Sequence, residues 1–200
     1  MKTRDLMIPD PITISETATI QDAIELMKVN SIRHLPVVGP GDDLRGFVTL
    51  ADLKQGLIPS MLGDLDLRDL IIRQPVTVGP DDDIEVAAQK IYKHKIGGMP
   101  VVAHNRLVGI LTETDILRAF IHMMGFLTAS SRVEVAMKAD RDDLQKALGV
   151  ISDAGGEVIN VAMTAQQKKK ICYFRLTPCR TGSIQRALEA AGFEVLEATD

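Results

Sequence analysis

The feature that most constrains the fold is an internal repeat. When the chain is shifted by 64 residues, residues 4–38 and 68–102 agree at 12 of 35 positions, whereas chance would give about two matches. Further along, the offset becomes 63 because one turn is a residue longer, and GFVTLAD at 46–52 then aligns with GILTETD at 109–115. Insertions confined to a turn are what a duplicated folding unit tolerates. The chain therefore contains one unit twice, followed by a tail with a different pattern.

Both copies of the unit predict the same order of elements, β-α-β-β-α. An extended piece comes first, and an amphipathic helix follows in which apolar residues recur at helical spacing. Two short strands joined by a turn then lead into a second helix. The extended pieces are 11–14 and 75–78, the strands are 35–38, 47–49, 99–102 and 107–112, and the second helices begin near Asp52 and Asp115. The expected caps of the first helices are Thr19 or Thr17 and Asp81 or Asp83.

The tail follows a different order, βαββαβ, which is that of ferredoxin-like folds. Residues 123–131 are typical of a linker, and 132–200 of a separate domain. The predicted strands are 133–137, 158–164, 171–176 and 193–198. The predicted helices run from about Asp142 to Gly155 and from a Ser183 cap to Gly192.

The composition argues against several classes of function. A net charge of −4 and a pI near 5.6 argue against a nucleic-acid-binding protein, which usually carries a basic surplus. No apolar stretch approaches the roughly 20 residues that cross a bilayer, and the amino terminus lacks the apolar core of a signal peptide. With two cysteines and no His or Cys cluster at metal-ligand spacing, we expect a cytoplasmic protein without a metal site. The chain shows no activated nucleophile and no paired carboxylates, so we expect no enzyme.

The duplicated unit, with its motifs at fixed spacing, resembles a tandem pair of cystathionine-β-synthase (CBS) domains, also called a Bateman module. The resemblance covers roughly residues 1–122, with repeat one at 1–58 and repeat two at 64–122. It implies that the repeats pack about a pseudo-twofold axis and bind an adenosyl ligand, such as AMP, ADP, ATP or S-adenosylmethionine, in the clefts between them. It also implies a regulatory role in which no cofactor is required beyond that ligand.

The sequence Thr-x-x-Asp, present in both copies, has two interpretations. One is a capping box, in which the threonine opens a helix and the acid reaches back to the threonine amide. Aspartate is one methylene shorter than glutamate and should be the poorer residue for that contact, yet both copies use it. The other, implied by the resemblance, is a ribose clamp, in which Asp52 and Asp115 accept the ribose hydroxyls while Thr49 and Thr112 contact ribose or phosphate. The two are partly compatible, because the threonine can cap its helix while the acid faces a cleft.

The resemblance also implies where the adenine lies, in an apolar slot edged by backbone polar groups. The residues assigned to this slot are Thr13, Leu35, Pro36, Thr77, Gly98, Met99 and Pro100, although such apolar residues can also simply build the core. A phosphate needs cations, and the candidates are Arg33, His34 and Lys95. Repeat two has Gly97 and Gly98 where repeat one has Arg33 and His34, which suggests two unequal sites.

The tail resembles an ACT domain, a small regulatory module that often pairs side by side and binds amino acids. The resemblance rests on the topology of the tail and on the sequence of the helix and its glycine end at 142–156. Amino-acid-binding members usually carry Pro-Gly after the first strand, whereas this chain has neither residue at 138–142, so we expect dimerisation there rather than effector binding. The helix start at Arg180-Thr-Gly-Ser183 can hold an anion or carry a simple cap.

The expected fold class is α+β, and the order of domains resembles the acetoin-utilisation AcuB-type proteins of bacteria. We expect a homodimeric regulatory sensor that passes the state of its ligand through the tail to an unidentified regulated protein. The alternative is an assembly module that binds no ligand and whose Thr-x-x-Asp sequences are only helix caps.

Overall fold

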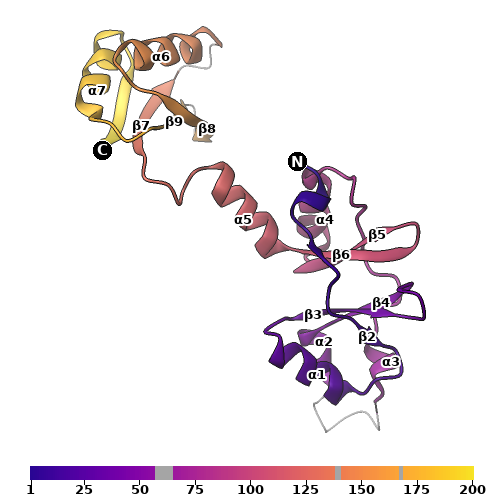
Figure 1. Ribbon diagram of the computed structural model, residues 1–200. Coiled ribbons are helices and arrows are strands. Elements are labelled where there is room, and N and C mark those ends of the chain that lie inside the picture. The colour runs from indigo at the N-terminus through magenta and orange to yellow at the C-terminus, as the bar shows by residue number, and fades with distance from the viewer. Residues whose placement is uncertain (57–64, 138–140, 167–168) are drawn as a thin grey trace. The chain divides into compact units, whose positions relative to one another are not determined.

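The computed structural model describes residues 1–56, 65–137, 141–166 and 169–200 (Figure 1). The chain divides into two compact units, Met1–Ala119 and Phe120–Asp200. The predicted end of repeat one, at residue 58, and the predicted start of repeat two, at residue 64, lie outside the described residues. The same holds for residues 138–140, which belong to the segment 138–142 that lacks Pro-Gly.

Repeat one folds as a three-stranded sheet with two helices. Its elements are β2 (Ile14–Ser15), α1 (Ile20–Val29), β3 (His34–Val38), β4 (Leu44–Thr49) and α2 (Leu50–Gly56). Strand β2 runs parallel to β3, and β3 runs antiparallel to β4. Helix α1 has the predicted cap: the Thr19 hydroxyl accepts a hydrogen bond from the Asp22 amide at 3.0 Å, and the Asp22 carboxylate accepts one from the Thr19 amide at 2.9 Å.

Repeat two has the same arrangement with one difference in its first strand. Its elements are α3 (Leu67–Leu70), α4 (Ile84–His94), β5 (Gly98–Ala103), β6 (Arg106–Thr112) and α5 (Glu113–Met123). Strands β5 and β6 form an antiparallel hairpin whose turn residues His104 and Asn105 have φ of 50° and 64°, the left-handed pair that a two-residue turn requires. Of the predicted strand 75–78, Val78 alone forms a bridge, parallel to Val101. Figure 1 shows the strands of both repeats between α4 on one side and α1, α2 and α3 on the other.

In each repeat, the residues before the first helix pair with a strand of the other repeat. We call residues 7–12 lead segment one and residues 71–76 lead segment two. Part of lead segment one is strand β1 (Ile8–Pro9), which pairs antiparallel with β6 of repeat two. In lead segment two, the Ile72 amide donates to the Phe47 carbonyl of β4 at 2.9 Å, and the Phe47 amide donates back to the Ile72 carbonyl at 3.1 Å. The exchange is reciprocal, as a twofold relation between the repeats requires.

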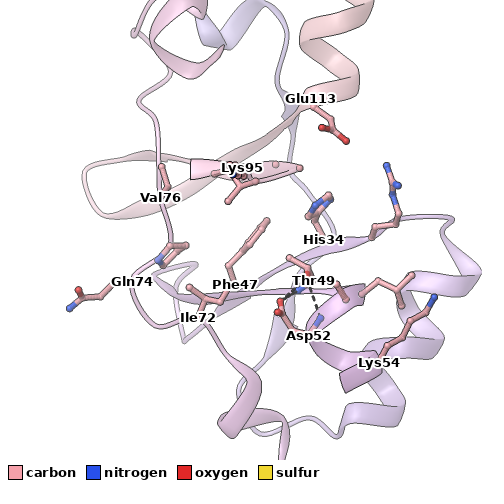
Figure 2. A pocket seen from close by; sticks show the side chains of 17 residues that line it. His34, Phe47, Thr49, Asp52, Lys54, Ile72, Gln74, Val76, Lys95 and Glu113 are labelled. Carbon is pink, nitrogen blue, oxygen red and sulfur yellow. Dashed lines mark hydrogen bonds between the residues drawn. The ribbon is translucent and has the colours of Figure 1, made fainter. Parts of the chain in front are cut away.

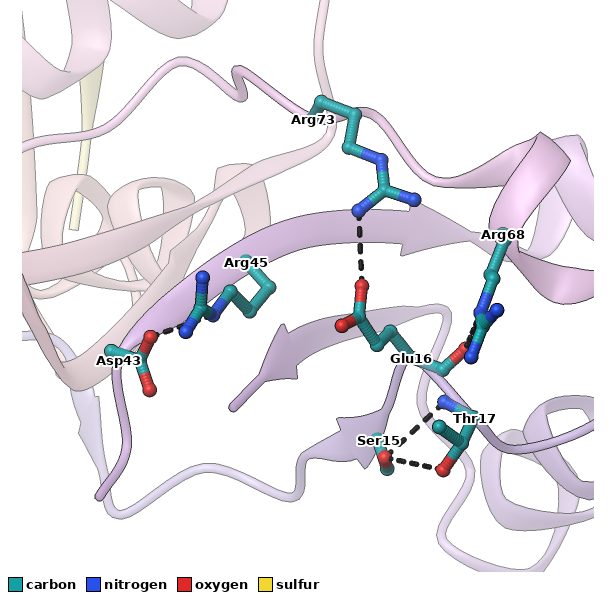
Figure 3. A network of polar contacts seen from close by, with 7 residues as sticks. All are labelled: Ser15, Glu16, Thr17, Asp43, Arg45, Arg68 and Arg73. Carbon is teal, nitrogen blue, oxygen red and sulfur yellow. Dashed lines mark hydrogen bonds and ion pairs between the residues drawn. The ribbon is translucent and has the colours of Figure 1, made fainter. Parts of the chain in front are cut away.

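Side-chain contacts hold the chain around lead segment two on repeat one (Figure 3). Arg73 donates to the Glu16 carboxylate at 3.0 Å, and Arg68 donates to the Glu16 backbone carbonyl at 3.3 Å. Leu67 of α3 is buried in the apolar core of repeat one. An exposed ion pair contributes at most about 1 kcal/mol, whereas a fully buried leucine contributes about 1.5–3 kcal/mol. Leu67 is therefore the stronger anchor.

Each repeat has its own apolar core between its first helix and its sheet, and apolar residues of that helix contribute to it. Core residues with no exposed surface are Ala23, Leu35, Val37, Val48 and Leu53 in repeat one and Ala87, Met99, Val101 and Leu111 in repeat two.

The second unit has the order βαββαβ that the sequence predicts. Its elements are β7 (Ser131–Met137), α6 (Arg141–Asp153), β8 (Val158–Gln166), β9 (Lys169–Leu176), α7 (Thr181–Ala190) and β10 (Glu194–Thr199). The four strands form one antiparallel sheet in the order β10-β7-β9-β8. Both helices contribute to one core with the sheet, and they lie on the same side of it (Figure 1).

The start of α7 differs from the prediction. Ser183 does not cap this helix, because the helix begins at Thr181 and Arg180 is its N-cap residue. The Thr181 amide and hydroxyl both donate to the Asp200 carboxylate, each at 2.7 Å, and these two hydrogen bonds lower the pKa of Asp200 below its ordinary value. The anion at this helix start is therefore a side chain of the chain itself.

Candidate ligand sites between the repeats

Both Thr-x-x-Asp sequences form complete capping boxes. The Asp52 Oδ2 accepts hydrogen bonds from the Thr49 amide at 3.1 Å and from the Thr49 hydroxyl at 2.6 Å, and the Asp52 amide approaches the same hydroxyl at 3.3 Å (Figure 2). Asp115 and Thr112 repeat this pattern at 3.0, 2.6 and 3.4 Å. Aspartate, which we expect to be the poorer residue for this contact, makes it in both repeats and also at Asp22 in the first turn of α1.

The cap uses only one oxygen of each carboxylate. Among the residues that the structure describes, Oδ1 of Asp52 has no hydrogen-bond partner, and Oδ1 of Asp115 lies 3.9 Å from an Arg118 guanidinium nitrogen. A carboxylate oxygen accepts more than one hydrogen bond. Each aspartate can therefore cap its helix and still accept hydrogen bonds from a ligand.

The first pocket contains Thr49 and Asp52, and we call it the Thr49 pocket. It has a cavity volume of about 620 Å³. Its wall combines the start of α2 with lead segment two and with the residues that open β5, so both repeats build it. Figure 2 shows Thr49, Asp52 and Lys54 on the side of repeat one, Lys95 and Glu113 on the side of repeat two, and His34 and Phe47 between them.

The second pocket contains Thr112 and Asp115, and we call it the Thr112 pocket. It is smaller, with a cavity volume of about 320 Å³. Lead segment one takes the place that lead segment two has in the other pocket, contributing Ile8, Asp10, Pro11 and Ile12. Arg118, one turn into α5, also lines it.

Of the residues assigned to the adenine slot, Gly98 lines a pocket, the Thr49 pocket. Leu35, Pro36, Met99 and Pro100 are buried, and none of them lines the Thr49 or the Thr112 pocket. Thr13 and Thr77 lie outside both pockets too, and the Thr77 carbonyl accepts a hydrogen bond from Lys90 at 2.7 Å. The reading of these residues as core fits Leu35 and Met99, which have no exposed surface.

The apolar walls come instead from the two lead segments. Ile72, Pro75 and Val76 line the Thr49 pocket, and their counterparts 64 residues earlier line the Thr112 pocket. Sequence reasoning missed these residues, although Ile8/Ile72 and Pro11/Pro75 are identical pairs in the repeat alignment. The signal was present, but the alignment does not say which repeat a lead segment packs against.

The three phosphate candidates all lie at the pockets. Lys95 lines the Thr49 pocket, and Arg33 and His34 line both pockets. The structure adds two positively charged residues that the sequence did not single out, Lys54 in the Thr49 pocket and Arg118 in the Thr112 pocket.

His34 occupies a partly buried position at the border of the two pockets. Its ring stacks on Phe47, with centroids 5.8 Å apart and planes at 19°. A side chain at Gly97 would place its Cβ 3.1 Å from His34 Nε2, so the glycine makes room for the ring. Burial and then the charge of Arg33 lower the pKa of His34, although Glu113 acts in the opposite direction. The net effect favours the neutral form of the His34 imidazole.

The described residues contain no group of three or more His, Cys, Asp or Glu side chains that could hold a metal ion. Within residues 1–56, 65–137, 141–166 and 169–200, the helices are also too short or too polar to cross a bilayer.

Solved structures similar to this chain include three that bear on the pockets. A Vibrio cholerae protein assigned to acetoin utilization (AcuB) is 34% identical, with a TM-score of 0.56 over 64% of this chain and 95% of its own. The CBS domain pair of protein MJ0100, in complex with 5′-methylthioadenosine and S-adenosyl-L-methionine, is 30% identical, with a TM-score of 0.56 over 60% of this chain and 99% of its own. CBSX2 in complex with AMP is 28% identical, with a TM-score of 0.54 over 61% of this chain and 97% of its own.

The curated relatives are longer proteins. A homoserine O-acetyltransferase from Methanocorpusculum labreanum is 38% identical over 115 residues, which make up 56% of this chain and 23% of that enzyme. The chain thus spans about a quarter of the length of the curated relatives that it matches first. The family model of the CBS domain matches residues 4–58 and again residues 67–122. The chain therefore belongs to the CBS-domain family and carries a tandem pair of these domains.

Proposed function

We propose that the chain is a regulatory sensor that binds an adenosyl ligand in the Thr49 and Thr112 pockets. The proposal rests on two carboxylates that each use only one of their oxygens in a helix cap. Asp52 and Asp115 each hold a helix cap with one oxygen and keep the other oxygen available beside an apolar wall. A cap alone explains the first oxygen but gives no reason for a pocket around the second.

The ligand would use each part of the pocket for a different chemical group. Two neighbouring ribose hydroxyls donate to the free aspartate oxygen, and the adenine packs on the lead segment. Thr49 and Thr112 contribute their hydroxyl oxygens at the same edge. In the Thr49 pocket, Arg33, Lys54 and Lys95 supply the positive charge that a phosphate group attracts.

The class of ligand is supported by related CBS domain pairs. The pair of protein MJ0100 was solved with 5′-methylthioadenosine and S-adenosyl-L-methionine, and CBSX2 was solved with AMP. All three compounds contain adenosine or a 5′-substituted derivative of it. AMP, ADP, ATP and S-adenosylmethionine are therefore the first candidates for this chain.

We further propose that the second unit is an ACT-like domain of ferredoxin-like topology. Its βαββαβ order and its strand order β10-β7-β9-β8 support this assignment. In this scheme it joins two chains and passes the ligand state to a regulated protein, as in an AcuB-type regulator. The chain itself is then a cytoplasmic regulator and not an enzyme.

The competing function is an assembly module that binds no ligand. The completed capping boxes favour it, since they give both Thr-x-x-Asp sequences a structural role. Helix α1 contains a third box, Thr19–Asp22, that lines neither pocket. This third box provides a matched control that separates the two functions.

The test is isothermal titration calorimetry of the full chain with AMP, ADP, ATP and S-adenosylmethionine. We expect at least one of them to bind with a Kd on the order of micromolar. The double variant Asp52→Ala/Asp115→Ala should lose this binding, because it removes both ribose acceptors. Asp22→Ala should keep the affinity while losing stability, because it removes one half of the capping box of α1.

Two results would favour the assembly module instead. One is the absence of heat with all four ligands at a tenfold excess. The other is unchanged binding in the double variant, with a loss of stability like that of Asp22→Ala at each cap. In either case the Thr-x-x-Asp sequences would be helix caps and nothing more.

A further inference from the structure

The two pockets meet at one pair of residues. Arg33 and His34 line the Thr49 pocket and also the Thr112 pocket. They stand at the start of β3, where the chain passes between the two pockets. Arg33 is exposed and has no ion-pair partner among the described residues, so its guanidinium is available to either pocket.

Repeat two has no second copy of this pair. The positions 64 residues later are Gly97 and Gly98, which line the Thr49 pocket alone. The two pockets therefore share one arginine at this position.

The two pockets differ in how much they depend on Arg33. The Thr49 pocket has two further cations, Lys54 and Lys95, beside the carboxylate of Glu113. The Thr112 pocket has one, Arg118, which already lies near Asp115, and it also contains the carboxylate of Asp10. A phosphate in the Thr112 pocket therefore depends on Arg33 more than a phosphate in the Thr49 pocket does.

We propose that Arg33 couples the two pockets, so that two phosphate-bearing ligands bind with negative cooperativity. This inference rests on the proposed function of the pockets. A phosphate in one pocket holds the guanidinium, and a phosphate that enters the other pocket must do without it. An adenosyl ligand without phosphate makes no demand on Arg33 and binds the Thr112 pocket independently. The sensor then favours a mixed state, with a nucleotide in the Thr49 pocket and a phosphate-free adenosyl compound in the Thr112 pocket.

The expected size of the coupling follows from the contact that is lost. A hydrogen bond between charged groups changes a binding constant by on the order of tenfold or more. Coupling of this size lies within the range known for allosteric pairs of sites, and it must act equally in both directions. We therefore expect the second AMP to bind about tenfold more weakly than it does when its pocket is filled alone.

The test compares each pocket alone with the intact pair by calorimetry. Asp115→Ala leaves the Thr49 pocket for AMP, and Asp52→Ala leaves the Thr112 pocket, so the two variants give the separate affinities. In the unaltered chain, the second AMP should bind about tenfold more weakly than its single-pocket value. Adenosine added to the chain loaded with one AMP should bind at its single-pocket affinity.

Arg33→Gln should weaken the binding of AMP in both pockets, and the two AMP molecules should then bind independently of each other. Arg106→Gln is the matched control, because Arg106 is an exposed arginine of the same unit that lines neither pocket. It should leave the tenfold coupling in place. A general loss of positive charge would instead affect both variants alike.

Several results would overturn the inference. These are two AMP sites that fill independently in the unaltered chain, coupling that persists in Arg33→Gln, or a pocket that takes no AMP even alone. In each of these cases an adenosyl ligand still binds, so the proposed function stands while the coupling fails. The absence of heat with every ligand in every variant would overturn the proposed function, and the coupling with it.

Discussion

At the scale of single residues, the glycine that opens both GFVTLAD and GILTETD has a role apart from capping and ligand binding. A Cβ on Gly46 would lie 2.9 Å from the Ile72 carbonyl oxygen, and a Cβ on Gly109 would lie 3.0 Å from the Ile8 carbonyl oxygen. Each glycine therefore lets the lead segment of the other repeat pass close to its strand. The motif combines this crossing point with a cap and a pocket carboxylate within seven residues.

Gly46→Ala and Gly109→Ala should each destabilise the first unit by about 1–3 kcal/mol, because the added methyl group overlaps a backbone that cannot move freely. Gly79→Ala is the matched control in the same unit, since its Cβ would make ordinary contacts at 3.5 Å with Asp82. Urea unfolding of the full chain measures all three. Equal midpoints for Gly46→Ala and Gly79→Ala would mean that the lead segment does not pass as closely as the structure has it.

At the scale of elements, the sequence predicts contacts between residues that are close in the chain and misses contacts between residues that are far apart in it. The cap of α1 at Thr19 is correct because the Thr-x-x-Asp contact spans three residues. The cap at Ser183 is wrong because its place is taken by Asp200, which lies 19 residues beyond Thr181. The main helices and the hairpin strands of both repeats follow from periodicity in the predicted order, but the predicted strand 75–78 is a single bridge at Val78, and β1 and α3 were not predicted.

The pockets were predictable in part for the same reason. Thr49, Asp52, Thr112 and Asp115 were found because they repeat. The apolar walls were assigned to residues such as Leu35 and Met99, which the sheets bury in their own cores. The 64-residue alignment is the same whether a lead segment packs on its own repeat or on the other repeat. The position of Ile72 in the Thr49 pocket could therefore be learned only from the structure.

At the scale of the whole molecule, the proposed dimer makes a prediction about mass. The edge strand β8 exposes Ile159 at 47% and Met163 at 51%, and apolar side chains at a sheet edge favour pairing with a second copy. Light scattering of the full chain should give twice the chain mass of 21.8 kDa. Met163→Lys should shift the chain toward the monomer, whereas Val29→Lys, at an exposed valine of α1, should not. A monomer at all concentrations would contradict this role of the second unit.

The central claim is that the Thr-x-x-Asp sequences at Thr49 and Thr112 are each a helix cap and a ribose clamp at once. The most direct measurement is a crystal structure of the full chain with saturating AMP. We predict AMP in at least the Thr49 pocket, with a ribose hydroxyl within about 3 Å of Asp52 Oδ1 while Oδ2 still accepts from Thr49, and with the adenine on lead segment two. Empty pockets, or AMP bound away from Asp52 and Asp115, would contradict the claim.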